Sequence, residues 1–388
     1  MTAMKKTFYI IAALMTLAAC AKVVPADESN NEISFQAVNY VGTKADDAAN
    51  AAAKPGEFTN EDFGAYAWYS PVEGQREGTP MFSNEKVAKV GSEWKTVDGT
   101  YFWPKTNTVD FISYSPYDEG KPAVTESSIK WTKYTVGEKD LMYADKALRQ
   151  GANVKTYYYN GVPTLFHHAL AKLSFKVKAN FLEWTQDEVK DPQTGEVVEK
   201  ETTKWEVSLK SIKLSGIYNT GDLTLTVADD GTWPLPEVGE AKAHVWTNLS
   251  GAAEEVELVT AKEGMALTTT AQDLYDGKSF YVIPQALAKG AQKITLSFHI
   301  KTIHTANIDK DGTQGENVDE EDFNKTIDIQ EISSLAAWQM NENIIYTICI
   351  KPTATTPEGN PDNPEDVVIT FDPAQNEWED VKDAIIQI

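Results

Sequence analysis

The side chains of this sequence that could do chemistry are few and scattered. Cys349 is a candidate nucleophile, His167 and His168 are adjacent candidate metal ligands, and Asp309–Glu320 is an acidic block with part of the spacing of a calcium loop. Cys349 stands between two isoleucines, which indicates a small core residue. Adjacent residues of a strand point to opposite faces, so the two histidines cannot hold one ion. The acidic block lacks the glycine and the flanking helices of a calcium loop, and we expect an acidic loop there.

No catalytic motif links these residues. The sequence has no Gly-x-Ser-x-Gly elbow, no His-Glu-x-x-His, no Cys-x-x-Cys and no glycine-rich phosphate loop. We therefore predict a protein that is not an enzyme and holds no cofactor and no metal. Its 58 acidic residues leave a glycosidase pair of carboxylates open as an alternative, because only their separation in space would reveal one. The net charge of −23 excludes a phosphate-binding surface for nucleic acid and suits a secreted surface protein.

The N-terminus offers a second kind of chemistry, the attachment of lipid. Lys5 and Lys6 form a basic start, Phe8–Leu17 is an apolar run too short to span a bilayer, and small residues precede Cys20. Leu-Ala-Ala-Cys at this place resembles the lipobox of bacterial lipoproteins, in which cleavage leaves the cysteine carrying lipid. We expect residues 1–20 to be a signal peptide and Cys20 to anchor the mature chain to a membrane. An ordinary signal peptide with an incidental cysteine is the alternative.

A third candidate is a protease-sensitive bond that follows a strand. In Ile33–Val41, the apolar residues Ile33, Phe35, Ala37 and Val41 follow a period of two, the pattern of a half-buried strand. A turn follows at 42–45, and then a run of small and polar residues that indicates an exposed loop. Because Lys44 is the basic residue next to this loop, one cut between Lys44 and Ala45 could release the strand.

The rest of the chain predicts β-strands separated by turn residues, without a competing helical period. In the first part we expect Phe63–Ser70, Lys86–Thr96, Thr100–Pro104, Val109–Ser115, Ser128–Tyr134 and Leu141–Ala144. Further on we expect Leu173–Val177, Trp205–Ile217, Asp222–Val227, Glu254–Val259, Ser279–Pro284, Lys293–Lys301, Thr326–Ile329 and Ile344–Ile350, with an exposed hairpin within 186–203. This pattern is typical of an all-β sandwich, and 388 residues favour two domains.

The C-terminal part ends in alternating apolar residues. Within 367–388 these are Val367, Ile369, Phe371, Ala384, Ile386 and Ile388. Exposed apolar residues near a terminus promote aggregation unless they have a binding place, so this segment has the character of a strand that awaits a groove.

Several motifs in this order resemble the fimbrillin family, the subunits of type V pili of anaerobic Gram-negative bacteria. The residues that carry the resemblance are the lipobox at Cys20, Ile33-Ser34-Phe35, Thr43-Lys44-Ala45, Tyr101-Phe102-Trp103-Pro104, residues 110–116, residues 166–175, Tyr281-Val282-Ile283-Pro284-Gln285, Trp338 with Asn341, Asn343 and Tyr346, and residues 369–374 with Trp378. The motifs are individually common and together run nearly from end to end.

The resemblance implies two tandem β-sandwich domains of the transthyretin-like (Ig-like) kind, and we expect them at 33–163 and 164–388. It implies an outer-membrane lipoprotein that a trypsin-like protease cuts, here after Lys44, so that the propeptide 21–44 leaves with its strand. The donor strand of a neighbouring subunit, here from 367–388, then fills the vacated place, and a fimbrium grows. Family members are often cut after arginine, so a lysine leaves the identity of the protease open.

Three other functions stay open at this point. A tip or anchor subunit of the same fimbriae differs only in whether it donates or loses a strand. A surface lipoprotein could instead bind glycans of host or bacterial surfaces, because sugar faces stack on tryptophans such as Trp68 or Trp233. A glycoside hydrolase is the third alternative.

Overall fold

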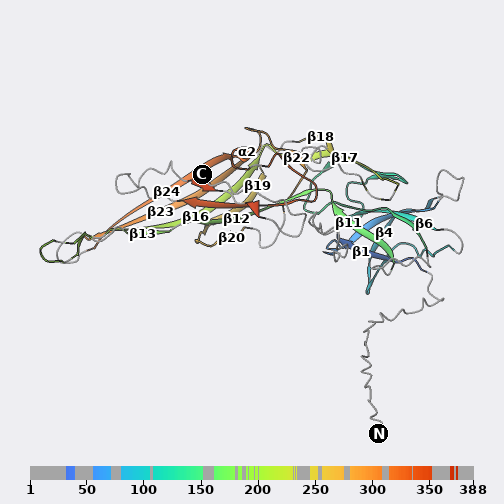
Figure 1. The fold of residues 1–388 in the computed structure, drawn as a ribbon, viewed down its shortest axis with the longest axis horizontal. Coiled ribbons are helices and arrows are strands. Elements are labelled where there is room, and N and C mark those ends of the chain that lie inside the picture. Colours follow the sequence, from blue (N-terminus) through green and yellow to red (C-terminus); the bar gives the residue numbers. More distant parts are fainter. Residues whose placement is uncertain are drawn as a thin grey trace, which may run out of the picture.

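The computed structural model is almost entirely β-structure, which confirms the predicted fold class. It describes residues 32–39, 56–70, 80–104, 108–151, 161–179, 182–185, 189–190, 192–195, 197–199, 201–229, 231, 233, 245–251, 256–274, 280–307, 314–333, 335–351, 368–370 and 373–374. The molecule is elongated: β1, β4, β6 and β11 lie at one end, and β13, β16, β23 and β24 extend to the other (Figure 1). No helix in this described part is long and apolar enough to cross a membrane.

The first sheet closes into a ring. Its strands, in spatial order, are β6 (Val109–Ser115), β3 (Asp62–Tyr69), β4 (Pro80–Val90), β5 (Glu93–Thr96), β1 (Phe35–Asn39), β11 (Val162–His168) and β9 (Met142–Ala144). The ring closes because β9 also pairs with β6. β10 (Ala147–Gln150) joins β6, and the short β2 (Gly56–Glu57) joins β1. Alternate side chains of these strands point inward and fill the ring with an apolar core that includes several phenylalanines.

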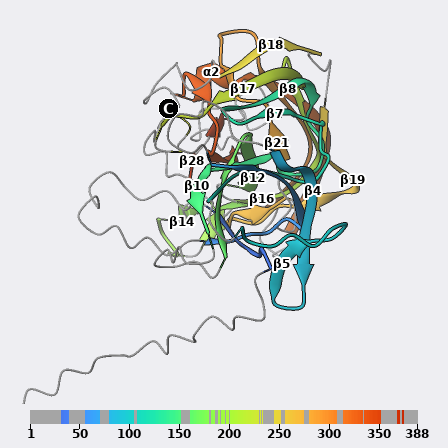
Figure 2. The same ribbon diagram turned by 90° about the vertical axis from the view of Figure 1, so that its right-hand side faces the viewer.

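A second sheet covers one side of this ring, as the end-on view shows (Figure 2). Its order is β18 (Trp246–Ser250), β17 (Thr220–Thr226), β8 (Ser128–Thr135) and β7 (Ala123–Thr125). Its inner face includes Trp131 and Leu223, which pack with Ile112 and Tyr114 from the outer face of the ring. β6 is therefore buried on both faces, which agrees with the burial of every one of its residues.

The other half of the molecule is a sandwich around one core. One layer is ordered β20 (Gln272–Asp273), β12 (Ala171–Ala179), β26 (Asn343–Lys351) and β27 (Val368–Thr370), with β21 (Phe280–Val282) and β28 (Pro373–Ala374) at its sides. The facing layer is β13 (Glu183–Thr185), β16 (Glu201–Ser215), β23 (Lys293–Asn307) and β24 (Gln314–Asp328), with β19 (Val256–Ala266) on β16. Apolar residues of both layers, among them Phe175, Leu296 and Ile348, form a single cluster.

Short elements complete the fold. They are the pairs β14 (Val189–Lys190) with β15 (Val197–Glu199) and β22 (Gln285–Ala286) with β25 (Ala337–Trp338), and the one-turn helix α2 (Ile329–Ile332). The β14–β15 pair is the hairpin predicted within 186–203. Asp328 caps α2, because its carboxylate accepts a hydrogen bond from the backbone of Gln330.

Three expectations about elements need correction. The strand predicted over Lys86–Thr96 is the hairpin of β4 and β5, with Gly91 at φ +66° in the turn. Thr100–Pro104 forms one isolated bridge, between Phe102 and Glu32. The acidic block expected as a loop is strand β24 from Gln314 onward, because each of its residues pairs with the apolar-patterned β23. The preceding residues of that block, 309–313, lie outside the described residues.

The predicted division into domains at 163/164 falls within strand β11, whose later residues pair with β1 and β9, and it also separates a further pair of strands. β8 precedes that point and β17 follows it, and the two pair over Ser128–Thr135 and Thr220–Thr226. The boundary itself stays a prediction.

Candidate functional site

The candidate site is the place of β1 in the ring, which we call the β1 slot: the position between β11 on one side and β5 with Tyr101 on the other. β1 runs parallel to β11, from the pair Phe35 with Val162 to the pair Asn39 with Phe166. On its other side it pairs antiparallel with β5, where Phe35 lies opposite Trp94, and further along with β2. β1 is therefore a central strand, and the ring is closed only while a strand fills the slot.

The side chains of β1 follow the predicted alternation. Ile33, Phe35 and Ala37 are buried, at 1%, 3% and 6% exposure, whereas Ser34 and Gln36 are half-buried. Burial of Ile33 and Phe35 contributes about 3 to 6 kcal/mol before the entropy of ordering is subtracted. The other two predicted features of this region, Val41 and the bond between Lys44 and Ala45, lie outside the described residues, as does Cys20.

Aromatic rings line the slot. Phe35 meets Phe63 of β3 and Phe111 of β6 edge to face, with ring centroids 5.5 and 5.7 Å apart. Beside them Phe58 stacks on Phe166 at 4.4 Å. Such pairs add about 0.5 to 1.5 kcal/mol each to the burial of area. These rings come from three other segments of the chain, which are 56–70, β6 and β11, and the sequence pattern of β1 alone does not indicate them.

Backbone contacts fix the register of β1. The backbone N–H of Ile33 donates to the carbonyl of Tyr101, and that of Val162 donates to the carbonyl of Ser34, both at 2.8 Å. Gly161 lies against the same carbonyl with a φ of +147°, and a Cβ there would be 2.7 Å from the Ser34 oxygen. The glycine is required because the two backbones approach so closely.

The ammonium group of Lys95 lies at the end of the β1 slot where β1 begins, which we call the entrance of the slot. The Lys95 ammonium contacts Glu32 Oε2 at 2.9 Å and Glu93 Oε2 at 3.0 Å. These hydrogen bonds, first to Glu32 and then to Glu93, raise the pKa of Lys95 above its ordinary value. Glu32 directly precedes the first buried residue of β1, so the ion pair ties the beginning of the strand to the ring.

The predicted donor segment is described only in part. β27 pairs antiparallel with β26, with Ile369 opposite Ile350, and β28 pairs with β26 through Ala374 and Ile345. Residues 368–370 and 373–374 thus add an edge to the chain's own sheet. The other predicted donor residues, which are Val367, Phe371, Ala384, Ile386 and Ile388, lie outside the described residues.

The other side chains that could do chemistry are paired with carboxylates or buried within the fold. His167 and His168 face separate carboxylates, at 3.0 Å from Asp145 and 2.5 Å from Asp140, as expected for adjacent residues of a strand. Cys349 is buried at 3% exposure in β26. Among the described residues, no group of three or more histidines, cysteines and acids could hold a metal.

The tryptophans considered for sugar binding are buried. Trp68 and Trp233 are both 7% exposed, and the indole N–H of Trp233 donates to the carbonyl of Ala144 at 2.8 Å. A sugar ring cannot stack on faces that are packed inside a core.

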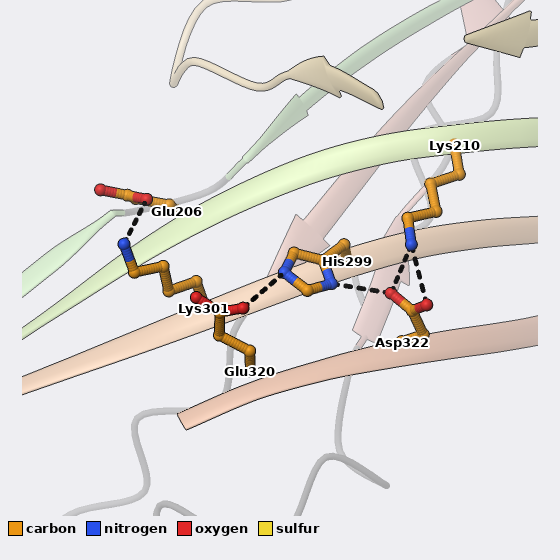
Figure 3. A network of polar contacts seen from close by, with 6 residues as sticks. All are labelled: Glu206, Lys210, His299, Lys301, Glu320 and Asp322. Carbon is orange, nitrogen blue, oxygen red and sulfur yellow. Dashed lines mark hydrogen bonds and ion pairs between the residues drawn. The ribbon is translucent and has the colours of Figure 1, made fainter. Parts of the chain in front are cut away.

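The outer face of the long sheet carries a network of charged side chains. Lys210 of β16 and His299 of β23 both contact Asp322 of β24, and Lys301 reaches Glu206 (Figure 3). These contacts link three neighbouring strands through exposed side chains. Charged residues along the edge strand β24 also disfavour its pairing with another chain.

Comparison with known proteins identifies the family. A family model described as fimbrillin-like matches residues 43–362. A fimbrial protein from Bacteroides vulgatus has a solved structure that is similar at a TM-score of 0.50 and 18% identity, over 90% of this chain and 100% of that one. The fimbrial anchor protein Mfa2 from Porphyromonas gingivalis matches at a TM-score of 0.27 and 10% identity, over 89% of this chain and 98% of that one. No curated protein sequence matches the chain.

Proposed function

Because the chain belongs to the fimbrillin-like family, we propose that it is a structural subunit of cell-surface fimbriae that polymerises by strand exchange. The subunit is exported as an outer-membrane lipoprotein with its lipid on Cys20. A trypsin-like protease cuts between Lys44 and Ala45, and the propeptide leaves with β1. A neighbouring subunit then inserts its donor segment into the β1 slot, and the resulting polymer supports adhesion. The subunit acts without catalysis of its own.

One observation carries this proposal: β1 is a central strand of a closed ring, and the segment that joins it to β2 contains Lys44. A strand on the same chain acts at an effective concentration of about millimolar, which a free strand from another subunit does not exceed. Cutting the segment removes this advantage, because a released β1 can dissociate and be diluted. Polymerisation is therefore blocked until the protease acts.

The donor in this scheme is the segment 367–388 of a neighbouring subunit. Its apolar residues Val367, Ile369, Phe371, Ala384, Ile386 and Ile388 are the candidates to replace those of β1. Donor and slot lie on different parts of one subunit, so the contact is head to tail. A head-to-tail contact that does not close gives a filament rather than a ring. Main-chain hydrogen bonds supply affinity, and alternate side chains supply specificity.

The burial of Trp68 and Trp233 removes the observation that favoured a glycan-binding lipoprotein. A tip or anchor subunit shares the same fold and differs only in how its slot and its donor segment are used. The experiment below therefore tests both ends of the chain.

The test is limited trypsin digestion of the purified precursor without its signal peptide and lipid. We expect a ladder of oligomers on gels, no ladder with Lys44→Gln, and no ladder from a chain that ends at residue 366. Lys54→Gln is the matched control, because Lys54 lies in the same segment but precedes a proline and is not a trypsin site. A wild-type chain that is fully cut at Lys44 and stays monomeric would contradict a polymerising subunit.

A further inference from the structure

The ion pair at the entrance of the β1 slot joins a residue that leaves to one that stays. Glu32 belongs to the propeptide, and Lys95 belongs to β5. The two side chains are 21% and 19% exposed, so the contact is partly shielded from water. The second partner of Lys95, Glu93, is 55% exposed and stays in the ring. Removal of β1 therefore leaves Lys95 with only its more solvated partner.

The backbone fixes which residue of a strand in the slot meets Lys95. Ile33 is held by Tyr101 and Ser34 by Val162, so Glu32 is placed one residue before the first buried side chain. A strand that enters in the same direction meets the same two backbone partners. Its residue one position before its first buried side chain then lies beside Lys95.

We propose that Lys95 selects and registers the incoming strand by binding a carboxylate directly ahead of its first buried apolar residue, and that this strand is Asp383–Ile388 of a second copy. The inference rests on the proposed function and adds a specificity-determining residue to it. In Glu32-Ile33-Ser34-Phe35-Gln36-Ala37, an acid is followed by apolar residues at the second, fourth and sixth positions. Asp383-Ala384-Ile385-Ile386-Gln387-Ile388 has the same order, including glutamine at the fifth position.

A second segment, Asp366–Phe371, also has an acid ahead of alternating apolar residues. Its residues 368–370 are paired with β26 in the chain's own sheet, where Thr370 lies opposite Cys349. That segment would have to break this ladder before it could enter another subunit. Asp383–Ile388 comes after residues 368–370 and 373–374 in the chain, so its use does not require the described ladder with β26 to break.

The size order of the two strands differs in a way that the slot can tolerate. The large residues stand at the first two buried positions in β1 and at the last two in Asp383–Ile388. The two sets differ in composition by one exchange of phenylalanine for isoleucine, and cores tolerate apolar substitutions of this kind when neighbouring side chains repack. The shapes of the buried side chains therefore distinguish only weakly between candidate strands. The positive charge of Lys95 distinguishes further, because it favours a strand with a carboxylate at the matching position.

The test uses the full-length precursor that has been cut by trypsin and then treated with a trypsin inhibitor, because the peptides contain Lys382. Excess fluorescent peptide of residues 381–388 is added after the inhibitor, and binding is measured by anisotropy. We expect the Asp383→Asn peptide to bind about two- to fivefold more weakly, the range of a partly exposed ion pair. This difference should vanish on Lys95→Met protein, and an Asp383→Lys peptide should bind Lys95→Glu protein better than the native peptide does. Lys86→Met is the matched control, because Lys86 pairs with Asp62 at 2.9 Å on the neighbouring strands and both residues remain after the cut.

The other outcomes are distinguishable. Equal binding of the native and Asp383→Asn peptides to wild-type protein would overturn the role of Lys95, whether or not the Lys95 variants fold. Tighter binding of a 364–372 peptide would overturn the choice of segment. A cut protein that releases β1 and binds neither peptide would overturn the proposed function together with this inference.

Discussion

The rings of Phe35 in β1 and Phe63 in β3 meet edge to face, with centroids 5.5 Å apart and planes inclined by 82°. Phe63 is fully buried, and Phe35 reaches it from a strand that is not its neighbour in the sheet. The contact therefore crosses the interior of the ring. It joins the part of the chain that we propose is removed to the part that remains.

Phe35→Ala should lower the free energy of unfolding by about 3 to 5 kcal/mol, because it removes a large buried ring and leaves a cavity between Phe63 and Phe111. Urea unfolding of the uncut precursor, followed by near-UV circular dichroism, measures the change. Gln36→Ala on the half-buried side of the same strand is the control and should change stability by less than about 1 kcal/mol. Equal effects of the two substitutions would contradict the inward packing of Phe35.

Gly161→Ala should weaken the docking of β1 by about 1 to 3 kcal/mol, because the added Cβ meets the Ser34 carbonyl and the backbone has a positive φ. Hydrogen exchange of the Val162 amide, which donates to that carbonyl, should become faster. Gly137→Ala is the matched control, since a Cβ at Gly137 meets no atom within 4 Å. Unchanged protection of Val162 in the Gly161 variant would refute the close approach.

Alkaline pH should destabilise the protein through Tyr346. Burial raises the pKa of Tyr346 to about 12 from its ordinary value of 10.0. Between these values the unfolded chain has lost the phenolic proton and the folded chain has kept it, so stability is full below pH 10 and falls as the pH rises toward 12. The loss for one such group approaches about 1.4 kcal/mol per pH unit.

Tyr346→Phe should make this dependence shallower, although it also removes the hydrogen bond that Tyr346 accepts from the Trp338 indole at 2.9 Å and so lowers stability at neutral pH. Chemical unfolding at several pH values between 9 and about 12 measures the slope. Tyr218→Phe, at a residue 38% exposed, should leave the slope unchanged. An identical slope in wild type and Tyr346→Phe would show that this tyrosine does not couple ionisation to unfolding.

Lys210→Met should raise the pKa of Asp322. The hydrogen bond from Lys210, and secondly that from His299, lower the pKa of this carboxylate below its ordinary value of 3.8. A lowered pKa contributes stability above the unfolded value, and that contribution is lost as the pH falls. A carbon-detected NMR titration of Asp322 should show the upward shift, and added salt should reduce it because the group is exposed. Lys289→Met, at an exposed pair with Glu331, is the control and should not move it.

Much of the fold follows from local patterns that the sequence displays. The alternation of Ile33, Phe35 and Ala37 predicts a strand with one buried face, and the same period of two predicts most strands of both halves. Such patterns can be recognised in a sequence because successive side chains of a strand point to opposite faces, whichever strand it pairs with. The opposite faces of His167 and His168 follow from the same geometry.

Strand β24 shows where local pattern fails. Its residues from Gln314 to Asp322 are polar and charged in nearly every position, so no periodicity marks them as a strand. They form one because β23 beside them is strongly patterned and offers a continuous ladder. The pairing partner β23 decides the outcome.

The sequence by itself determined an all-β chain with a strand near residue 35 and a basic residue, Lys44, behind it, because strand periodicity and residue type are local properties. The tertiary structure decided that this strand runs parallel to Val162–Phe166, that it closes a ring, and that Glu32 meets Lys95 from 63 residues away. These relationships depend on pairing and register between distant segments. Residue types along one strand do not encode them, because any strand of the same alternation could fill the same position.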